Sequence, residues 1–169
     1  MNNQISTSEC PDCGASVPMI EGPVHPYFGS NAGCWRLYGE ILEREYSDPR
    51  YMKVHRLTVD AYAAQHPGKN EPRSAQSVNV HLMALYLVFE RGMSYEFATK
   101  ALGKAVERKK HQFRWLPPPQ RLGSITVLDV VRSPTPDEHE RIVKAWANDV
   151  WIAWQSHWDE IERLANDVI

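Results

Sequence analysis

The chain has 169 residues, of which 43% are hydrophobic and 24% charged, and its formal net charge at pH 7 is -2. This composition excludes a disordered chain, and a chain of this length can bury about two-thirds of its unfolded surface, so a core forms without disulfide support. No apolar run approaches the roughly 20 residues that a bilayer span needs, and the first residues lack the pattern of a signal peptide. We therefore expect a cytoplasmic globular protein that does not cross a membrane.

Residues 1–33 are dense in glycine and proline, which predicts a loop-rich N-terminal lobe without long regular elements. From Cys34 to Tyr46, apolar residues recur at helical spacing and predict a first helix that ends near Ser47. Asp48 is placed to cap a second helix with Pro49 at its first position, and this helix should run to about Gln65. A tight turn at this point would fold the two helices back antiparallel.

Three more helices follow in the sequence. Ser74 is placed to cap a third helix that ends near Gly92 and is apolar nearly all round, so we expect it at the centre of the bundle. A fourth begins at Ser94 and carries Phe97 and Leu102 on one face. After the extended segment 115–119, residues 124–131 favour a capped helical turn over a strand. Thr135 and Glu138 form a capping-box pattern for a last helix that reaches Leu164.

A Cys-x-x-Cys motif, Cys10 to Cys13 with Gly14 directly after it, can turn two sulfurs towards one metal ion. The third cysteine, Cys34, stands where the first helix begins, and the free N–H groups of a helix N-terminus favour a thiolate. In the cytoplasm thiols stay reduced and are available for metal binding. The three cysteines therefore predict three ligands of one site.

His66 is the predicted fourth ligand. The first helix is roughly 21 Å long and the second roughly 25 Å, so the end of an antiparallel second helix returns to the start of the first. His66 then lies beside Cys34, whereas His55 lies about 16 Å further down the bundle. His25, which belongs to the same lobe as the Cys-x-x-Cys motif, is the competing candidate because it requires no helical hairpin.

A set of three cysteines and one histidine without a carboxylate is typical of a structural zinc ion. Two alternatives remain at this point: unliganded reduced cysteines in a coil, or a redox pair of Cys10 and Cys13. The redox motif normally opens a helix after a buried strand, a context that residues 14–18 do not resemble. The sequence thus predicts a mainly α, single-domain protein, 1–169, of about five helices (34–169) and a zinc-stapled lobe (1–33).

The segments CPDCGAS, HPYFGSNAGCWRLYGEILEREYSDP, VHRLTVDAYAAQHPG, QSVNVHL and EHERIVKAWANDVWIAWQSH resemble those of an uncharacterised bacterial family, recorded as a domain of unknown function. The resemblance covers most of the chain. It implies a recurring arrangement of Cys-x-x-Cys, a later cysteine and a later His-Pro, which matches Cys10, Cys13, Cys34 and His66. It implies no activity.

Two further histidines raise the question of a second site. His81 falls on the buried side of the third helix together with Ser77, and His55 lies on the second helix. The first interpretation is that both are hydrogen-bonded core residues, with Asp60 pairing with Arg56 one turn away. The alternative is that His55, His66 and His81 line a pocket between the second and third helices and act as acid and base or hold a catalytic metal.

Two surface features are relevant to binding partners. The basic run that includes Lys104, Arg108, Lys109, Lys110 and His111 is interrupted by Glu107, and we interpret it as a solvated helix face rather than a nucleic-acid site. The last helix carries more aromatic side chains than one packing stripe requires, so Trp151 or Trp158 is a candidate contact for another protein.

The sequence therefore supports two functional hypotheses from different classes. The first is a non-enzymatic helical module that is stabilised by a structural zinc ion and binds a partner protein. The second is a small metal-dependent or acid-base enzyme that uses His55 and His81. No catalytic residue is identified, and the substrate is unknown.

Overall fold

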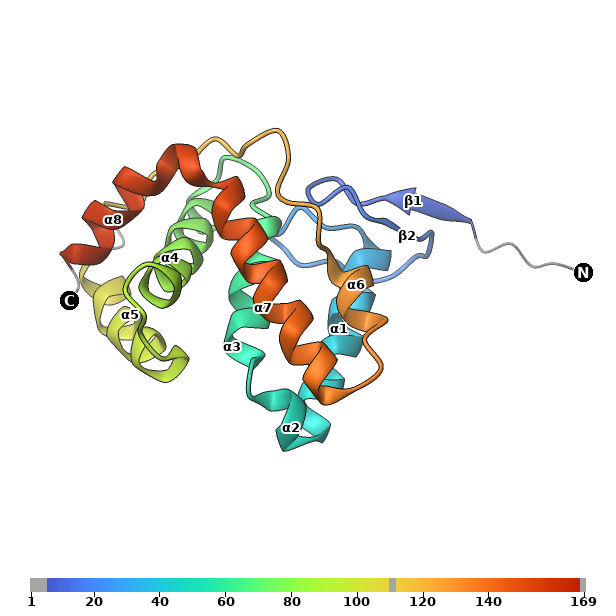
Figure 1. Cartoon of the computed structure of the whole chain (residues 1–169). Helices are drawn as coiled ribbons and strands as arrows, with labels where there is room; N and C mark the ends of the chain where they lie inside the picture. Colours follow the sequence, from blue (N-terminus) through green and yellow to red (C-terminus); the bar gives the residue numbers. More distant parts are fainter. Residues whose placement is uncertain (1–5, 110–111, 168–169) are drawn as a thin grey trace, which may run out of the picture.

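The computed structural model describes residues 6–109 and 112–167 and is mainly helical (Figure 1). This confirms the predicted fold class. The elements in chain order are β1 (Thr7–Glu9), β2 (Ser16–Pro18), α1 (Ala32–Ser47), α2 (Pro49–Met52), α3 (His55–Gln65), α4 (Pro72–Phe89), α5 (Tyr95–Lys109), α6 (Val127–Val131), α7 (Pro136–Ala153) and α8 (Trp158–Asn166). A 3-10 turn, η2 (Gln155–His157), separates α7 from α8.

The N-terminal lobe contains a small antiparallel hairpin that the sequence did not predict. Ser8 of β1 pairs with Val17 of β2, and the six-residue segment 10–15 forms the connecting loop. Val17 is buried, and Gly33 at the start of α1 lies so close to the strand that an added Cβ would be 2.1 Å from the carbonyl oxygen of Pro18. Only a glycine permits this close contact between the hairpin and α1.

The predicted second helix is in fact two helices, and this part of the prediction was wrong. Residues 53 and 54 interrupt the helix, and α2 turns towards α7, where Tyr51 packs edge-on against His139 at 5.0 Å between ring centroids. The interruption depends on a tertiary contact that helical periodicity does not reveal. The return of the chain is as expected: α3 runs back along α1, and Tyr38 stacks on Tyr62 at 3.8 Å.

Helix α4 lies at the centre of the bundle, as its apolar composition predicts, and it packs against α3, α5, α7 and α8 (Figure 1). Its start differs from the prediction, because the cap position is Glu71 and Pro72 is the first helical residue. Ser74 is not the cap. Its side chain is buried inside the first turn, where the hydroxyl donates to the carbonyl oxygen of Tyr27.

Helix α5 begins where predicted, and the Ser94 hydroxyl accepts a hydrogen bond from the backbone N–H of Phe97. Phe97 itself is 55% exposed, contrary to its predicted place on the apolar face, whereas Leu102 of the same predicted face is buried, as is Ala98. Lys110 and His111 of the basic run lie outside the described residues.

In the described part of the chain, no helix has both the length and the apolar character that crossing a membrane requires.

The C-terminal third follows its predicted caps but not its predicted length. Thr126 and Asp129 form a reciprocal capping box on α6, and the Thr135 hydroxyl caps α7. The capping box predicted for Thr135 and Glu138 is only half formed, because the Glu138 carboxylate pairs with Arg141. The predicted last helix breaks after Ala153. There the carbonyl oxygen of Trp151 accepts from the backbone N–H of Trp154 and, at 3.0 Å, from the indole N–H of Trp158.

Candidate metal centre

Three separate segments bring Cys10, Cys13, Cys34 and His66 together. The two cysteines of the motif lie in the loop between β1 and β2, Cys34 lies in the first turn of α1, and His66 directly follows α3. These ends of the elements meet on the hairpin side of the bundle (Figure 1). The four ligand atoms lie within 4.8 Å of one another, so the cluster could hold a metal ion.

The spacing of the ligand atoms is close to that of a tetrahedral zinc site. With Zn–S bonds of about 2.3 Å and Zn–N bonds of about 2.0 Å, tetrahedral geometry separates two sulfurs by about 3.8 Å and a sulfur from a nitrogen by about 3.5 Å. The Sγ atoms of Cys13 and Cys34 are 4.0 Å apart, and Sγ of Cys34 is 3.3 Å from Nε2 of His66. Small side-chain adjustments would therefore accommodate the ion.

The ring of His66 is oriented for coordination through Nε2. Its Nδ1 lies 2.7 Å from the backbone carbonyl oxygen of Tyr62, which can only accept a hydrogen bond, so Nδ1 carries a proton and Nε2 is the nitrogen that faces the sulfurs. Metal-bound histidines usually have such a partner on the other ring nitrogen. The Tyr62 hydroxyl donates to Sγ of Cys34 at 3.6 Å, and His66 is fully buried.

Backbone hydrogen bonds shape the loop that carries Cys10 and Cys13. The N–H of Gly14 donates to the carbonyl oxygen of Cys10, the N–H of Cys10 donates to that of Ala15, and Gly14 adopts a φ of 71°. A left-handed residue at this point suits glycine. The motif thus turns tightly enough for both sulfurs to face the same point.

Asp12 joins this loop to the segment that carries His66. Its carboxylate accepts a hydrogen bond of 2.7 Å from the N–H of Gly68, and its own N–H donates to the carbonyl oxygen of Gly29. A Cβ on Gly29 would lie 2.0 Å from the Asp12 carboxylate, so glycine is required there. Burial raises the pKa of Asp12, although the hydrogen bond from Gly68 opposes that rise.

Without an ion, the four groups influence one another's protonation strongly. Hydrogen bonds from Cys13 and Cys34 lower the pKa of Cys10 far below its ordinary value, whereas hydrogen bonding to Cys10 and Cys13 raises that of Cys34. Burial disfavours a charged His66, but its hydrogen bonds to Cys10 and Cys13 outweigh burial and raise its pKa to about 9.

The competing ligand candidate lies elsewhere in the lobe. His25 stacks on Phe28 at 4.0 Å, and its Nδ1 faces the N–H of Tyr27.

The sequence analysis did not identify Asn31 as the cap of α1. Its side-chain oxygen accepts from the N–H of Cys34, and its amide nitrogen donates to Ser8 of β1. The available signal was an asparagine three residues before Cys34 at a helix start.

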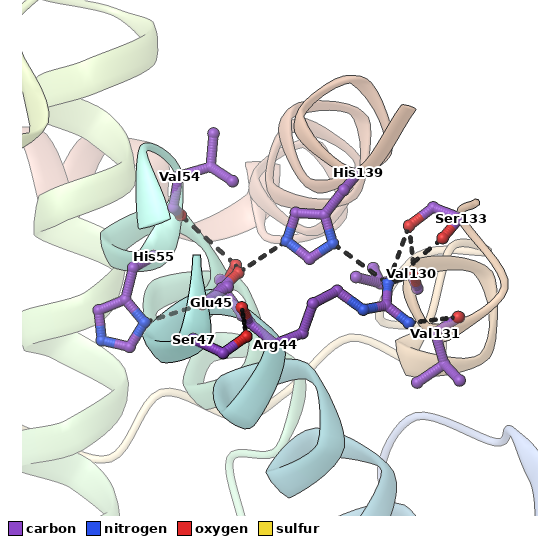
Figure 2. Close-up of polar contacts among 10 residues, drawn as sticks. Arg44, Glu45, Ser47, Val54, His55, Val130, Val131, Ser133 and His139 are labelled. Atoms are coloured by element: carbon purple, nitrogen blue, oxygen red, sulfur yellow. Dashed lines mark hydrogen bonds and ion pairs between the residues drawn. The ribbon is translucent and has the colours of Figure 1, made fainter. Parts of the chain in front are cut away.

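The predicted second set of histidines does not form one site. His55 binds Glu45 of α1 through Nδ1 at 2.8 Å, and the other carboxylate oxygen of Glu45 accepts from Nε2 of His139 at 2.9 Å (Figure 2). Arg44 faces Nδ1 of His139 at 3.5 Å and donates to the carbonyl oxygens at the end of α6 (Figure 2). Since a guanidinium only donates, Nδ1 of His139 is an acceptor and its Nε2–H donates to Glu45.

His81 lies in a different environment from His55 and His66. Its Nδ1 is 2.7 Å from a carboxylate oxygen of Asp60, so Asp60 pairs with His81 and not with Arg56 as predicted. Arg56 donates instead to the hydroxyl of Thr99. Among residues 6–109 and 112–167, one group of three or more histidine, cysteine or carboxylate side chains is spaced closely enough to hold a metal ion. It consists of Cys10, Cys13, Cys34 and His66.

The tryptophans of the last two helices serve mainly as core residues. Trp146, Trp151 and Trp154 are buried, and their indole N–H groups donate to Gln65, Glu90 and the carbonyl oxygen of Ala64. Trp158 is half-buried and stacks on Trp151 at 5.1 Å. Of this set, Trp158 therefore presents the accessible ring.

Fold and site together define a mainly helical protein with a buried Cys3His cluster that could hold a metal ion. The chain belongs to a family of unknown function, DUF5946, whose model matches residues 8–155 and so includes all four cluster residues. This match confirms the resemblance found in the sequence. Neither a curated protein nor a solved structure matches the chain.

Proposed function

We propose that Cys10, Cys13, Cys34 and His66 bind one structural zinc ion and that the chain is a zinc-stabilised interaction module. The observation that carries the proposal is the convergence of four soft, carboxylate-free ligands from three segments within 4.8 Å. Four protein ligands fill a tetrahedral zinc ion and leave no open position for a substrate, which is the arrangement of structural rather than catalytic zinc. A reducing cytoplasmic location fits a site built on free thiols.

The role of the ion follows from the positions of its ligands. The hairpin loop contributes two of them, while α1 and the end of α3 contribute the others. Zinc would therefore fix the small β-hairpin, which is too short to be stable alone, to the end of the helical bundle.

Metal analysis of protein purified without added zinc tests the proposal. We expect about one zinc ion per chain in the wild-type protein and a large loss of zinc in Cys13→Ala and His66→Ala. His25→Ala is the matched control, because it removes a histidine of the same lobe from outside the cluster and should retain the ion. Absence of stoichiometric metal from the wild-type protein, or equal loss in His25→Ala and His66→Ala, contradicts the proposal.

The partner of the module would contact the groove beside Trp158. Tyr86, Glu90, Arg91, Trp151, Trp158, Asp159 and Glu162 line this groove, which has a volume of about 420 Å³. Carboxylates outnumber the one guanidinium, and that guanidinium already binds Asn166. An aromatic ring among carboxylates suits a lysine side chain, so the partner is a protein that presents a basic segment.

Tryptophan fluorescence during titration with a lysine-rich peptide tests this part. We expect saturable binding to the wild-type protein and at least a fivefold loss of affinity in Trp158→Ala, since an exposed cation–π contact contributes about 1 kcal/mol. Ile152→Ala, an exposed position on α7, is the control and should bind as the wild type does. Equal binding by Trp158→Ala and Ile152→Ala would show that the groove is not the docking surface.

A further inference from the structure

A cavity of about 400 Å³ lies against α4, and none of the four residues of the Cys3His cluster lines it. Tyr27, Arg73, Gln76, Ser77, Val80, His81 and Val106 line it. Its volume is within the range of small-molecule sites, which typically combine apolar walls with a few convergent polar groups. Here Tyr27, Val80 and Val106 provide the apolar part, and the polar groups come from one helix.

The polar groups stand one helical turn apart on a single face of α4. Arg73, Ser77 and His81 follow one another at intervals of four residues, so their side chains share a face. The lining contains a guanidinium and no carboxylate. An occupant that meets the guanidinium of Arg73 and the hydroxyl of Ser77 together would be a hydrogen-bond acceptor with negative charge.

Asp60 fixes the imidazole of His81 for this purpose. Asp60 is buried on α3, and its carboxylate accepts from Nδ1 of His81 at 2.7 Å. Nδ1 thereby carries the proton, and Nε2 offers a lone pair that accepts a hydrogen bond from a ligand. No partner for Nε2 exists among residues 6–109 and 112–167.

Ser77 supplies an independent observation. Its hydroxyl oxygen is buried and has no hydrogen-bond partner among the residues that the structure describes. Buried hydroxyl groups nearly always have partners, and an unsatisfied one beside a cavity indicates a bound molecule or water. Arg73 is exposed and has no ion pair within the described residues, so its guanidinium is free to meet a ligand.

We propose that this cavity binds a small molecule that carries an oxyanion, a phosphate ester or a carboxylate, attached to an apolar or aromatic group. The guanidinium of Arg73 and the hydroxyl of Ser77 donate to the oxyanion, Nε2 of His81 accepts from a hydroxyl or N–H group of the same ligand, and Tyr27 with the two valines contacts the apolar group. Guanidinium groups bind both kinds of oxyanion in a bidentate manner. The site is independent of the proposed zinc ion, which none of its residues binds.

Calorimetric titration of the purified full-length protein tests this assignment with three probes that share a ring: phenyl phosphate, benzoate and phenol. We expect phenyl phosphate or benzoate to bind at least tenfold more tightly than phenol, and the stronger of the two identifies the oxyanion. Arg73→Gln should weaken that binding at least tenfold. Arg132→Gln, an exposed arginine outside the cavity, is the matched control and should leave the affinity unchanged.

Ser77→Ala separates a binding role from a structural one. Removal of an unsatisfied buried hydroxyl should leave the melting temperature unchanged or raise it, while the affinity for the preferred probe falls about threefold. Failure of both anionic probes to bind better than phenol would overturn the proposal. Equal binding by the wild type, Arg73→Gln and Ser77→Ala would also overturn it.

Discussion

The Cys13→Ser variant is expected to unfold about 10 °C below the wild-type protein. Serine has nearly the size of cysteine, and position 13 is half-buried, so packing changes little. The hydroxyl, however, is a poor zinc ligand. A metal ion present at a thousand times its dissociation constant stabilises the folded state by about 4 kcal/mol, and in a chain of this length each kcal/mol shifts the melting temperature by about 2–4 °C.

A chelator provides the internal control for this experiment. Scanning calorimetry with and without a strong zinc chelator should show that chelation lowers the melting temperature of the wild type to near that of Cys13→Ser. The variant itself should respond little. Tyr62→Phe is the matched comparison, because it removes the hydroxyl that donates to Cys34 and keeps all four ligands. That variant should stay sensitive to the chelator, and a wild type insensitive to it would contradict a structural metal.

Much of this cluster was predictable from the sequence because local chemistry determines it. Cys10 and Cys13 with the following glycine encode a turn, and the helix break at His66-Pro67-Gly68 marks where the chain returns to Cys34. The Asp48 cap also formed as predicted, through its side-chain contact with the N–H of Arg50. Each of these features depends on residues within a few positions of one another.

The features that the sequence did not reveal depend on distant partners. The interruption at residues 53 and 54 reflects a contact of Tyr51 with His139, and the break after Ala153 reflects the Trp158 indole. Helical spacing does not reveal a partner for Glu45, since His139 lies 94 residues further along the chain. Tyr46, placed on the apolar face of α1, is 65% exposed. Periodicity indicates which face is buried but not what that face meets.

The Glu45→Gln variant is expected to lose about 2–4 kcal/mol of unfolding free energy at pH 7. Glu45 is fully buried, and its carboxylate accepts from His55, His139 and Thr58, which join α1 to α3 and α7. A glutamine has one acceptor oxygen and places an N–H2 group against a donor. Chemical denaturation should show this loss, and Glu40→Gln, an exposed residue paired with Arg36 on the same helix, should change stability by less than about 0.5 kcal/mol.

The pH dependence of that difference tests the cause. Burial alone raises the pKa of a carboxyl group, but hydrogen bonds from His139, His55 and Thr58 outweigh burial and hold the pKa of Glu45 below its ordinary value. A group whose pKa is lowered by folding stabilises the protein above its unfolded-state pKa, about 4.3 for glutamate, and loses that contribution as the pH falls through the lower folded-state value. The advantage of the wild type over Glu45→Gln should therefore be complete at pH 7 and shrink on acidification below about pH 4. If the advantage instead grows on acidification, the neutral rather than the ionised carboxyl group joins the three helices.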